Sequence, residues 1–276
     1  TSLPEISLLY ALFYIKSGTN LNSLLECENG AQQDRLVGGA QKILDHMAAE
    51  LGDALRLNAP VDSISQADGL VTVVGNDHRQ TAAKVIVAIP PVLAGRIRYS
   101  PELPPLRDQL TQRMPMGTVI KCYGIYEKPF WRERGLNGQA VLDESSVLQT
   151  VFDNSPVDGS PGMLMGFSLA NRARKLLRLS ESERQAVVIN EFVRLFGEQA
   201  RNPVHYIDRS WADEPWSRGC FGAIMPPGSV VGYIDAIRQP CGNIHWAGTE
   251  TATVWNGYME GAILSGERAA QEVLEV

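Results

Sequence analysis

The sequence predicts a mixed α/β fold, in which helices and strands intermingle instead of forming an all-helical or all-strand domain. Three observations support this prediction: an apolar pattern of helical period at residues 43–51, short strand-like runs between residues 55 and 89, and a C-terminal strand, glycine-containing turn and long helix. With 276 residues, of which 44% are hydrophobic and 20% charged, the chain has an ordinary globular composition and room for about two domains.

The first half of the chain is expected to form two helices and then three strands. Leu, Tyr and Phe dominate residues 7–16, which predicts a buried helix that ends at Gly18-Thr19-Asn20. The next helix is ended by Gly52, and its apolar positions are Ile43, Leu44, Met47, Ala48 and Leu51. Turn residues separate three strands of a predicted β-meander, at 55–64, 70–74 and 84–89.

The second half predicts further helices and strands around a loop-rich stretch at residues 154–162. Ser180 and Glu183 form a capping box, which begins a helix that Gly197 ends. The other expected elements are a helix at 106–114, strands at 118–126, 204–211 and 243–247, and a long helix from about Gly257. That last helix carries small residues that would let another backbone approach closely, namely Gly261, Ala262, Ser265, Gly266, Ala269 and Ala270.

Charge and composition exclude several classes of protein. The 25 basic residues against 31 acidic ones give a net charge of −6, so a nucleic acid is not expected as a partner. No apolar run approaches the roughly 18 residues that span a bilayer, and nothing resembles a signal peptide, so no membrane contact is expected. The four cysteines lack metal-site spacing, which predicts no metal and a reduced, cytoplasmic setting.

The familiar catalytic motifs GxGxxG, GxxxxGK[ST], GxSxG and HExxH do not occur in the sequence. The most informative stretch is 244–251, followed by 255–261, where a strand leads through a Gly/Thr turn to a helix N-terminus. Free backbone N–H groups and the positive end of the helix dipole suit an anion or an electron-rich ring edge. An ordinary strand–helix connection would give the same pattern, and the turn alone leaves both interpretations open.

This stretch resembles the C-terminal flavin motif of the flavin-containing monoamine oxidases. The residues that carry the resemblance are Ala247-Gly248-Thr249-Glu250-Thr251-Ala252-Thr253, Trp255, Gly257 to Ala262 and Gly266 to Ala270. Further stretches follow in the order of that family: Ala88-Ile89-Pro90-Pro91, Val119 to Cys122, Lys128 to Arg132, Ala173 to Leu176, Pro203 to Tyr206 and Gly219 to Phe221. The resemblance implies an FAD-dependent amine oxidase, in which a hydride equivalent leaves the amine for the flavin, the imine hydrolyses to an aldehyde, and O2 becomes H2O2.

The resemblance also implies three catalytic residues. Lys121 matches the family's lysine that holds a water at flavin N5; the alternative is an exposed strand lysine, but its apolar neighbours predict a strand buried on both faces. Phe221 and Tyr258 match the aromatic pair that encloses the substrate amine. The family's best-known members have tyrosine at Phe221, so we expect an altered substrate preference there.

Further residues match cofactor-binding and substrate-binding positions. Cys220 matches the cysteine that bonds covalently to the flavin; some relatives bind FAD non-covalently, and a buried cysteine is usually inert, so both modes stay open. The remaining matches to cofactor-binding positions are Val61, Trp211, Trp216, Gly248, Thr249, Glu250, Gly257 and Met259. Leu25 and Gln32 match positions that line the substrate cavity.

The resemblance breaks at the N-terminus, because the family's first βαβ unit with its GxGxxG has no counterpart here. We expect a substrate-binding domain from 1–36 and 112–213, and returning parts of the FAD-binding domain from 37–111 and 214–276. The chain starts at Thr1 and ends soon after its last helix, which predicts a fragment of a soluble, bacterial-type member. Such a fragment would bind FAD weakly or not at all. It could also be a non-catalytic module that self-associates as a homo-oligomer, or half of an enzyme whose missing N-terminal half is a separate chain.

Overall fold

The structure is a computed structural model, which describes residues 2–275 and divides into two compact units. Unit 1 contains the residues up to Ile6 together with Met116–Ile224, and unit 2 contains Ser7–Pro115 and the residues from Met225 onward. Residues 7–36 group with unit 2, whereas the expected substrate-binding domain contained 1–36. Which unit binds substrate and which binds flavin stays a prediction.

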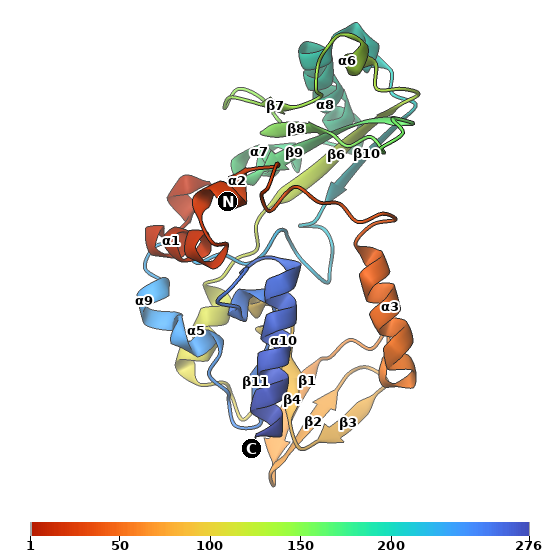
Figure 1. The fold of residues 1–276 in the computed structure, drawn as a ribbon. Helices are drawn as coiled ribbons and strands as arrows, with labels where there is room; N and C mark the ends of the chain where they lie inside the picture. Colours follow the sequence, from red (N-terminus) through yellow and green to blue (C-terminus); the bar gives the residue numbers. More distant parts are fainter. Residues whose placement is uncertain (1, 276) are drawn as a thin grey trace. The chain divides into compact units, whose positions relative to one another are not determined.

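Unit 1 is built on a five-stranded antiparallel sheet with strand order β10-β6-β9-β8-β7 (Figure 1). Its strands are β6 (Val119–Tyr126), β7 (Ala140–Val141), β8 (Thr150–Asp153), β9 (Gly162–Leu169) and β10 (His205–Ser210). Its helices are η1 (Leu3–Glu5), α6 (Phe130–Glu133), α7 (Ala170–Leu176), α8 (Glu181–Phe196) and η3 (Glu198–Arg201). The capping box of Ser180 and Glu183 is confirmed, and Gly197 ends α8 as predicted.

One face of this sheet forms the core of unit 1, against helix α8 (Figure 1). Alternate side chains of β6, among them Ile120 and Cys122, are buried there with Phe192 of α8. Of the intervening side chains, Val119 is buried, whereas Lys121, Tyr123 and Ile125 are half-buried. The expectation that this strand is buried on both faces therefore holds for one face and only in part for the face that carries Lys121.

Asp153, at the end of β8, gives unit 1 a predicted acid sensitivity. Burial would raise the pKa of Asp153, but hydrogen bonds from Arg132, Ser155 and Trp131 outweigh it and lower the pKa to about 2. The distances are 2.7 Å from Arg132 Nε and 2.8 Å from Trp131 Nε1. Because this pKa lies below the ordinary value of about 3.9, the carboxylate stabilises the fold above pH 4, and this contribution is lost as pH falls from about 4 to about 2.

We expect Asp153→Asn to lower the free energy of unfolding at pH 7 by about 1–2 kcal/mol and to flatten its dependence on pH between 2 and 4. Urea unfolding across this pH range measures both effects. Asp213→Asn, at an exposed carboxylate of the same unit, serves as the control. An unchanged pH slope in Asp153→Asn would contradict the assignment.

Unit 2 contains two sheets. The first has strand order β3-β2-β1-β5, where β1 (Ser63–Ala67), β2 (Leu70–Val74) and β3 (Arg79–Ala82) are antiparallel and β5 (Arg98–Ser100) pairs in parallel with β1. The second pairs β11 (Ile244–Trp246) with β4 (Val85–Val87) in parallel. The predicted β-meander is therefore confirmed at its first turn, between β1 and β2. Its third strand was predicted wrongly: β3 pairs with β2 instead, and residues 85–87 pair with the C-terminal strand β11.

The helices of unit 2 surround these sheets (Figure 1). They are α1 (Leu8–Ser17), α2 (Leu21–Leu25), α3 (Gln41–Leu51), η2 (Gly52–Ala54), α4 (Pro91–Ala94), α5 (Pro105–Gln112), α9 (Val230–Tyr233), η4 (Asp235–Ile237), η5 (Thr249–Thr251) and α10 (Met259–Leu274). The first helix forms as predicted, but the prediction that it is buried is wrong, because Leu8 is 75% exposed and Leu12 54% exposed. The end of α3 at Gly52 is confirmed, although α3 buries none of its residues.

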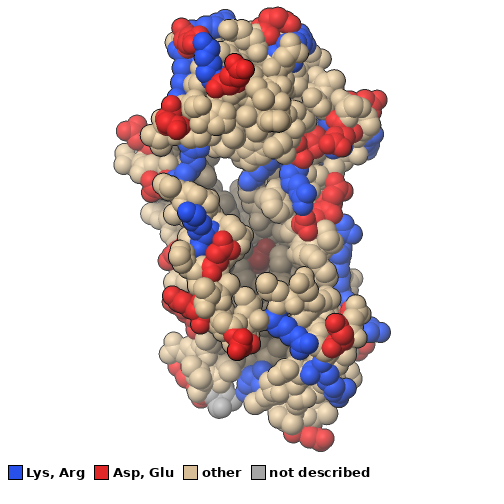
Figure 2. Space-filling view, turned by 90° about the vertical axis from the view of Figure 1, so that its right-hand side faces the viewer, with Lys and Arg blue, Asp and Glu red and all other residues tan. Residues whose placement is uncertain are grey.

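The surface carries mixed charge. On the face shown in Figure 2, basic and acidic side chains are interspersed. Within residues 2–275, no helix combines the length and hydrophobicity needed to cross a membrane. Over the same residues, no three His, Cys, Asp or Glu side chains come together as metal ligands.

Candidate active site

Lys121 lies on the second face of the unit 1 sheet, among aromatic rings. It stands opposite Phe167 in the pairing of β6 with β9. Its Nζ lies 5.5 Å from the centre of the Phe167 ring and 5.9 Å from that of Phe221, whose centroids are 6.2 Å apart. An ammonium group over ring faces is an attractive electrostatic arrangement. Phe221 is 61% exposed, so the group is open on one side.

Cys220 is the residue before Phe221 in the sequence and therefore lies next to Lys121 and its two aromatic rings. Its N–H donates to the Gly117 carbonyl at 2.8 Å, which attaches the segment to the residues just before β6. Burial raises the pKa of the Cys220 thiol, while the positive charge of Lys121 opposes this shift. The structure therefore brings Lys121, Cys220 and Phe221 together in unit 1.

Two predicted tryptophans belong to the same unit but differ in exposure. Trp211 is half-buried, its backbone N–H donates to Val119, and its buried Nε1 has no hydrogen-bond partner among the described residues. Trp216 is 71% exposed.

The Gly/Thr turn and the start of α10 form the second group of predicted residues, in unit 2. Gly248 has φ +104° and donates its N–H to Ser265 Oγ at 3.0 Å. Thr249 Oγ1 accepts from the Gly257 N–H at 2.7 Å and donates to the Tyr258 carbonyl at 2.9 Å. These bonds fix the turn to the helix start, and the N-terminus of α10 has no side-chain cap.

Tyr258 is held by two other aromatic residues of unit 2. Its ring stacks near Tyr14, with centroids 6.3 Å apart, and meets Trp255 edge-on at 5.2 Å. Burial, followed by the contact with Tyr258, raises the pKa of Tyr14. Lys121 and Phe221 belong to unit 1 and Tyr258 to unit 2, so the pairing of Phe221 with Tyr258 stays a prediction.

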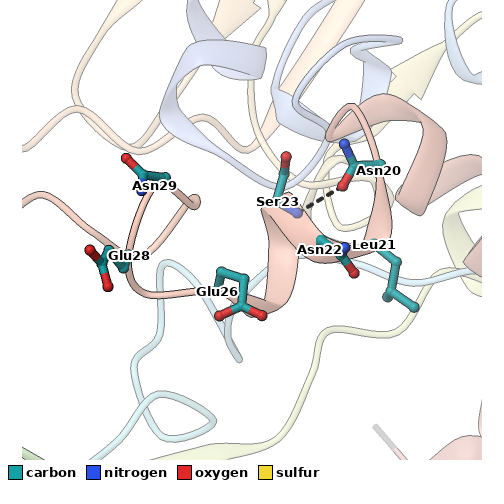
Figure 3. A pocket seen from close by; sticks show the side chains of 7 residues that line it. All are labelled: Asn20, Leu21, Asn22, Ser23, Glu26, Glu28 and Asn29. Carbon is teal, nitrogen blue, oxygen red and sulfur yellow. Dashed lines mark hydrogen bonds between the residues drawn. The ribbon is translucent and has the colours of Figure 1, made fainter.

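The remaining predicted site residues of unit 2 differ in how exposed they are. Glu250 is buried, Val61 is half-buried and Met259 is 48% exposed. Leu25 is 67% exposed on α2, and Gln32 is exposed in the loop that follows. An open pocket of about 540 Å³ lies in the same segment of the chain (Figure 3), lined by Asn20, Leu21, Asn22, Ser23, Glu26, Glu28 and Asn29. No predicted site residue lines this pocket, so we do not assign the pocket to the active site.

Sequence reasoning missed the residue that organises the turn. Asn256 is 2% exposed, and its Nδ2 donates to the carbonyls of Thr249, Glu250 and Ala252 at 3.0–3.2 Å. Its Oδ1 accepts from the Tyr10 hydroxyl at 3.1 Å. A polar residue between Trp255 and Gly257 could have indicated a structural role for Asn256, but the sequence does not show which groups it bonds. Phe167 was also missed, because the sequence does not show that it lies beside Lys121 on the neighbouring strand.

The residues present fit a flavin. Gly248 and Gly257, at a strand end and just before a helix start, both have positive φ, which side-chain-bearing residues rarely adopt, and a Cβ at Gly257 would lie 3.3 Å from the Tyr14 ring. The uncapped N-terminus of α10 offers N–H groups to electron-rich ring atoms. In unit 1, the buried Nε1 of Trp211 has no hydrogen-bond partner among the described residues. The turn and helix start of unit 2 thus present backbone N–H groups of the kind that suit an electron-rich cofactor.

Comparison with known proteins identifies the family. The family profile described as "Flavin containing amine oxidoreductase" matches residues 6–274. The chain is 43% identical over 278 aligned residues to the flavin-containing amine oxidase of Danio rerio, covering 99% of this chain and 53% of that protein. The chain belongs to the flavin-containing amine oxidase family, and the resemblance found in the sequence is confirmed.

Solved structures agree with the mixed α/β class. Cyclohexylamine oxidase from Brevibacterium oxydans superposes with a TM-score of 0.92 at 32% identity, over 98% of this chain and 60% of that one. Wild-type putrescine oxidase bound to putrescine superposes with a TM-score of 0.93 at 33% identity, over 99% of this chain and 60% of that one. The chain spans about half the length of the curated relatives it matches and about 60% of these solved chains.

Proposed function

We propose that the protein containing this chain oxidises primary amines with FAD as cofactor and O2 as electron acceptor. The overall reaction is RCH2NH2 + O2 + H2O → RCHO + NH3 + H2O2, in which the amine carbon loses two electrons and oxygen gains them. Membership of the flavin-containing amine oxidase family supports this proposal. The observation that carries it is the position of Lys121 Nζ over the rings of Phe167 and Phe221.

The residues of unit 1 would serve this reaction in two ways. The Lys121 ammonium would place a positive charge and a hydrogen-bond donor at the reacting centre, holding a water there and favouring the negative charge that develops as oxygen is reduced. The faces of Phe221 and, in unit 2, Tyr258 would contact the amine and exclude water around it. Phe221 has no hydroxyl group, so it would accept apolar or aromatic amines without offering a hydrogen bond. Bound FAD supplies the two-electron chemistry.

The turn and helix start of unit 2 would hold the cofactor. Gly248 and Gly257 would allow close approach of the backbone, while Thr249 and Met259 would contact the ring system from the turn and the first turn of α10. Val61, Glu250, Trp211 and Trp216 would complete the cofactor contacts, and Leu25 and Gln32 would line the path of the substrate.

The test is amine-dependent peroxide formation by the natural protein that contains this chain, purified with its flavin. A panel of benzylamine, cyclohexylamine and putrescine would separate aromatic, cyclic and linear substrates; cyclohexylamine and putrescine are named with two of the solved relatives. We expect H2O2 and the carbonyl product (an aldehyde from benzylamine or putrescine, a ketone from cyclohexylamine) in equal amounts with at least one amine, and no peroxide from protein stripped of flavin. A flavin-loaded protein that forms no peroxide with any of the panel would overturn the proposal.

A second candidate function, as a module that associates with another chain, is favoured by helix α3. Its apolar residues Ile43, Leu44, Met47 and Leu51 are 37–54% exposed, and the helix buries none of its residues. Light scattering of the 276-residue chain distinguishes the two: a monomer that stays soluble argues against self-association. A dimer that Leu44→Gln with Met47→Gln converts to monomer would support it.

Cys220 gives a prediction about how the cofactor is attached. If a thioether joins Cys220 to FAD, acid precipitation should leave all the flavin on the wild-type protein, and Cys220→Ala should release all of it to the supernatant. Cys27→Ala, which alters an exposed cysteine, should behave as wild type. Release of free FAD from the wild-type protein would show instead that the cofactor is held without a covalent bond.

A further inference from the structure

Two arginines meet at Thr251, the last residue of the Gly248–Thr251 turn. Arg238, which follows η4, donates from Nε to the Thr251 carbonyl at 2.6 Å. Arg268, on α10, donates from Nη2 to the Thr251 hydroxyl at 3.0 Å and to the Trp246 carbonyl at 2.7 Å. Thr251 is 3% exposed, so both guanidinium groups reach it from inside unit 2.

Thr251 is in turn hydrogen-bonded to Gly248, so the arginines are connected to Gly248 through it. The Thr251 hydroxyl, which accepts from Arg268, donates in turn to the Gly248 carbonyl at 2.8 Å, and the Thr251 N–H donates to the same carbonyl at 2.9 Å. The Gly248 N–H is bound to Ser265 Oγ. Both polar groups of the Gly248 backbone are therefore fixed from the interior, and the direction of its carbonyl depends on the placement of Thr251.

The surroundings of Arg238 disfavour its positive charge. Burial, and then the nearby positive charge of Arg268, lower the pKa of Arg238. Arg268 is paired with Glu272, whose Oε2 also lies 3.2 Å from His245 Nδ1. Arg238 has no such carboxylate within ion-pair distance among the described residues; the more distant charges of Asp235 and Glu272 favour its charged form, and its hydrogen bond to the Thr251 carbonyl adds a direct contact that offsets the cost of burial.

From this geometry we infer that Arg238 is a positioning residue for the cofactor: it holds Thr251, and through it the Gly248 turn, in the conformation that receives the flavin. This inference rests on the proposed function. Arg268 also contacts Thr251, but it connects α10 to β11 as well, so replacing it would change both the turn and the packing of the helix. Arg238 lies in a loop, so replacing it tests the effect on the turn with less disturbance of the packing.

The experiment compares Arg238→Met, Arg238→Lys and the control Arg96→Met, an exposed arginine of the same unit, in the natural protein produced without FAD. Amide hydrogen exchange of the Thr251 and Ala252 N–H groups, which bond to Gly248 and Thr249, reports on the turn without any cofactor. Fluorescence titration then gives the dissociation constant for FAD. Urea unfolding measures global stability in parallel.

We expect Arg238→Met to lower the protection of these two amides about tenfold and to weaken FAD binding about tenfold, with protection of β6 and β9 unchanged. Arg238→Lys keeps a donor and should recover part of both effects, and Arg96→Met should change neither. Unchanged protection at the turn, or a loss spread evenly over the whole chain, would overturn the inference. If the wild-type protein binds no FAD while the turn still loosens in Arg238→Met, the proposed function fails and the role of Arg238 in the turn is supported.

Discussion

Replacing Lys121 with methionine should slow reaction with oxygen about 100-fold or more in the amine-reduced enzyme, and change anaerobic reduction by amine only a few-fold. The asymmetry follows from charge. Oxygen acquires negative charge as it is reduced, and a preorganised ammonium group in a site shielded from water contributes most where charge develops. Methionine fills a similar volume and keeps contact with the rings of Phe167 and Phe221, so binding of an apolar amine should survive.

Stopped-flow absorbance of the holoenzyme separates the two half-reactions. Lys128→Met is the matched control, because Lys128 lies in the same unit, is exposed and pairs only at the surface with Glu133, where such a pair contributes little. Equal slowing of both half-reactions by Lys121→Met would contradict the role assigned to Lys121 in the reaction with oxygen.

Local signals in the sequence predicted local structure well. The capping box at Ser180 and Glu183, the end of α3 at Gly52 and the turn before β2 are confirmed, because each depends on residues only a few positions apart. The family motifs singled out Lys121, Cys220 and Phe221, but the expected domain boundary at residue 213 separated Lys121 from the other two, whereas the structure places all three in unit 1.

Features that depend on distant pairing could not be predicted. Residues 85–87 looked like the next strand of a meander, but they pair with residues 244–246, which lie 159 positions later, and nothing in either segment specifies the partner. The periodicity of residues 7–16 indicated a helix, yet whether Leu8 is covered depends on what packs against it. Burial on both faces was inferred for β6 from its apolar composition, but the structure buries one face and leaves most side chains of the other half-buried.

Asn256 illustrates the same limit and gives the largest predicted effect on stability. Asn256→Ala should lower the free energy of unfolding of unit 2 by about 2–4 kcal/mol, because the carbonyls of Thr249, Glu250 and Ala252 lose a shared donor and the Tyr10 hydroxyl loses an acceptor in the interior. Asparagine supplies two N–H groups and an oxygen on one planar group, which no apolar residue of that size can replace.

Urea unfolding followed by tryptophan fluorescence measures this loss, because Trp246 and Trp255 lie in the same unit as Asn256. Asn22→Ala, at an exposed asparagine of α2, should change the free energy of unfolding by less than about 0.5 kcal/mol. Tyr10→Phe removes one partner of Asn256 and should cost about 1 kcal/mol, less than Asn256→Ala because the three carbonyl contacts remain. If Asn256→Ala were no more destabilising than Tyr10→Phe, the three carbonyl contacts would contribute little, and the turn would have to be held by the contacts of Thr249 and Thr251, including those that Arg238 and Arg268 make to Thr251.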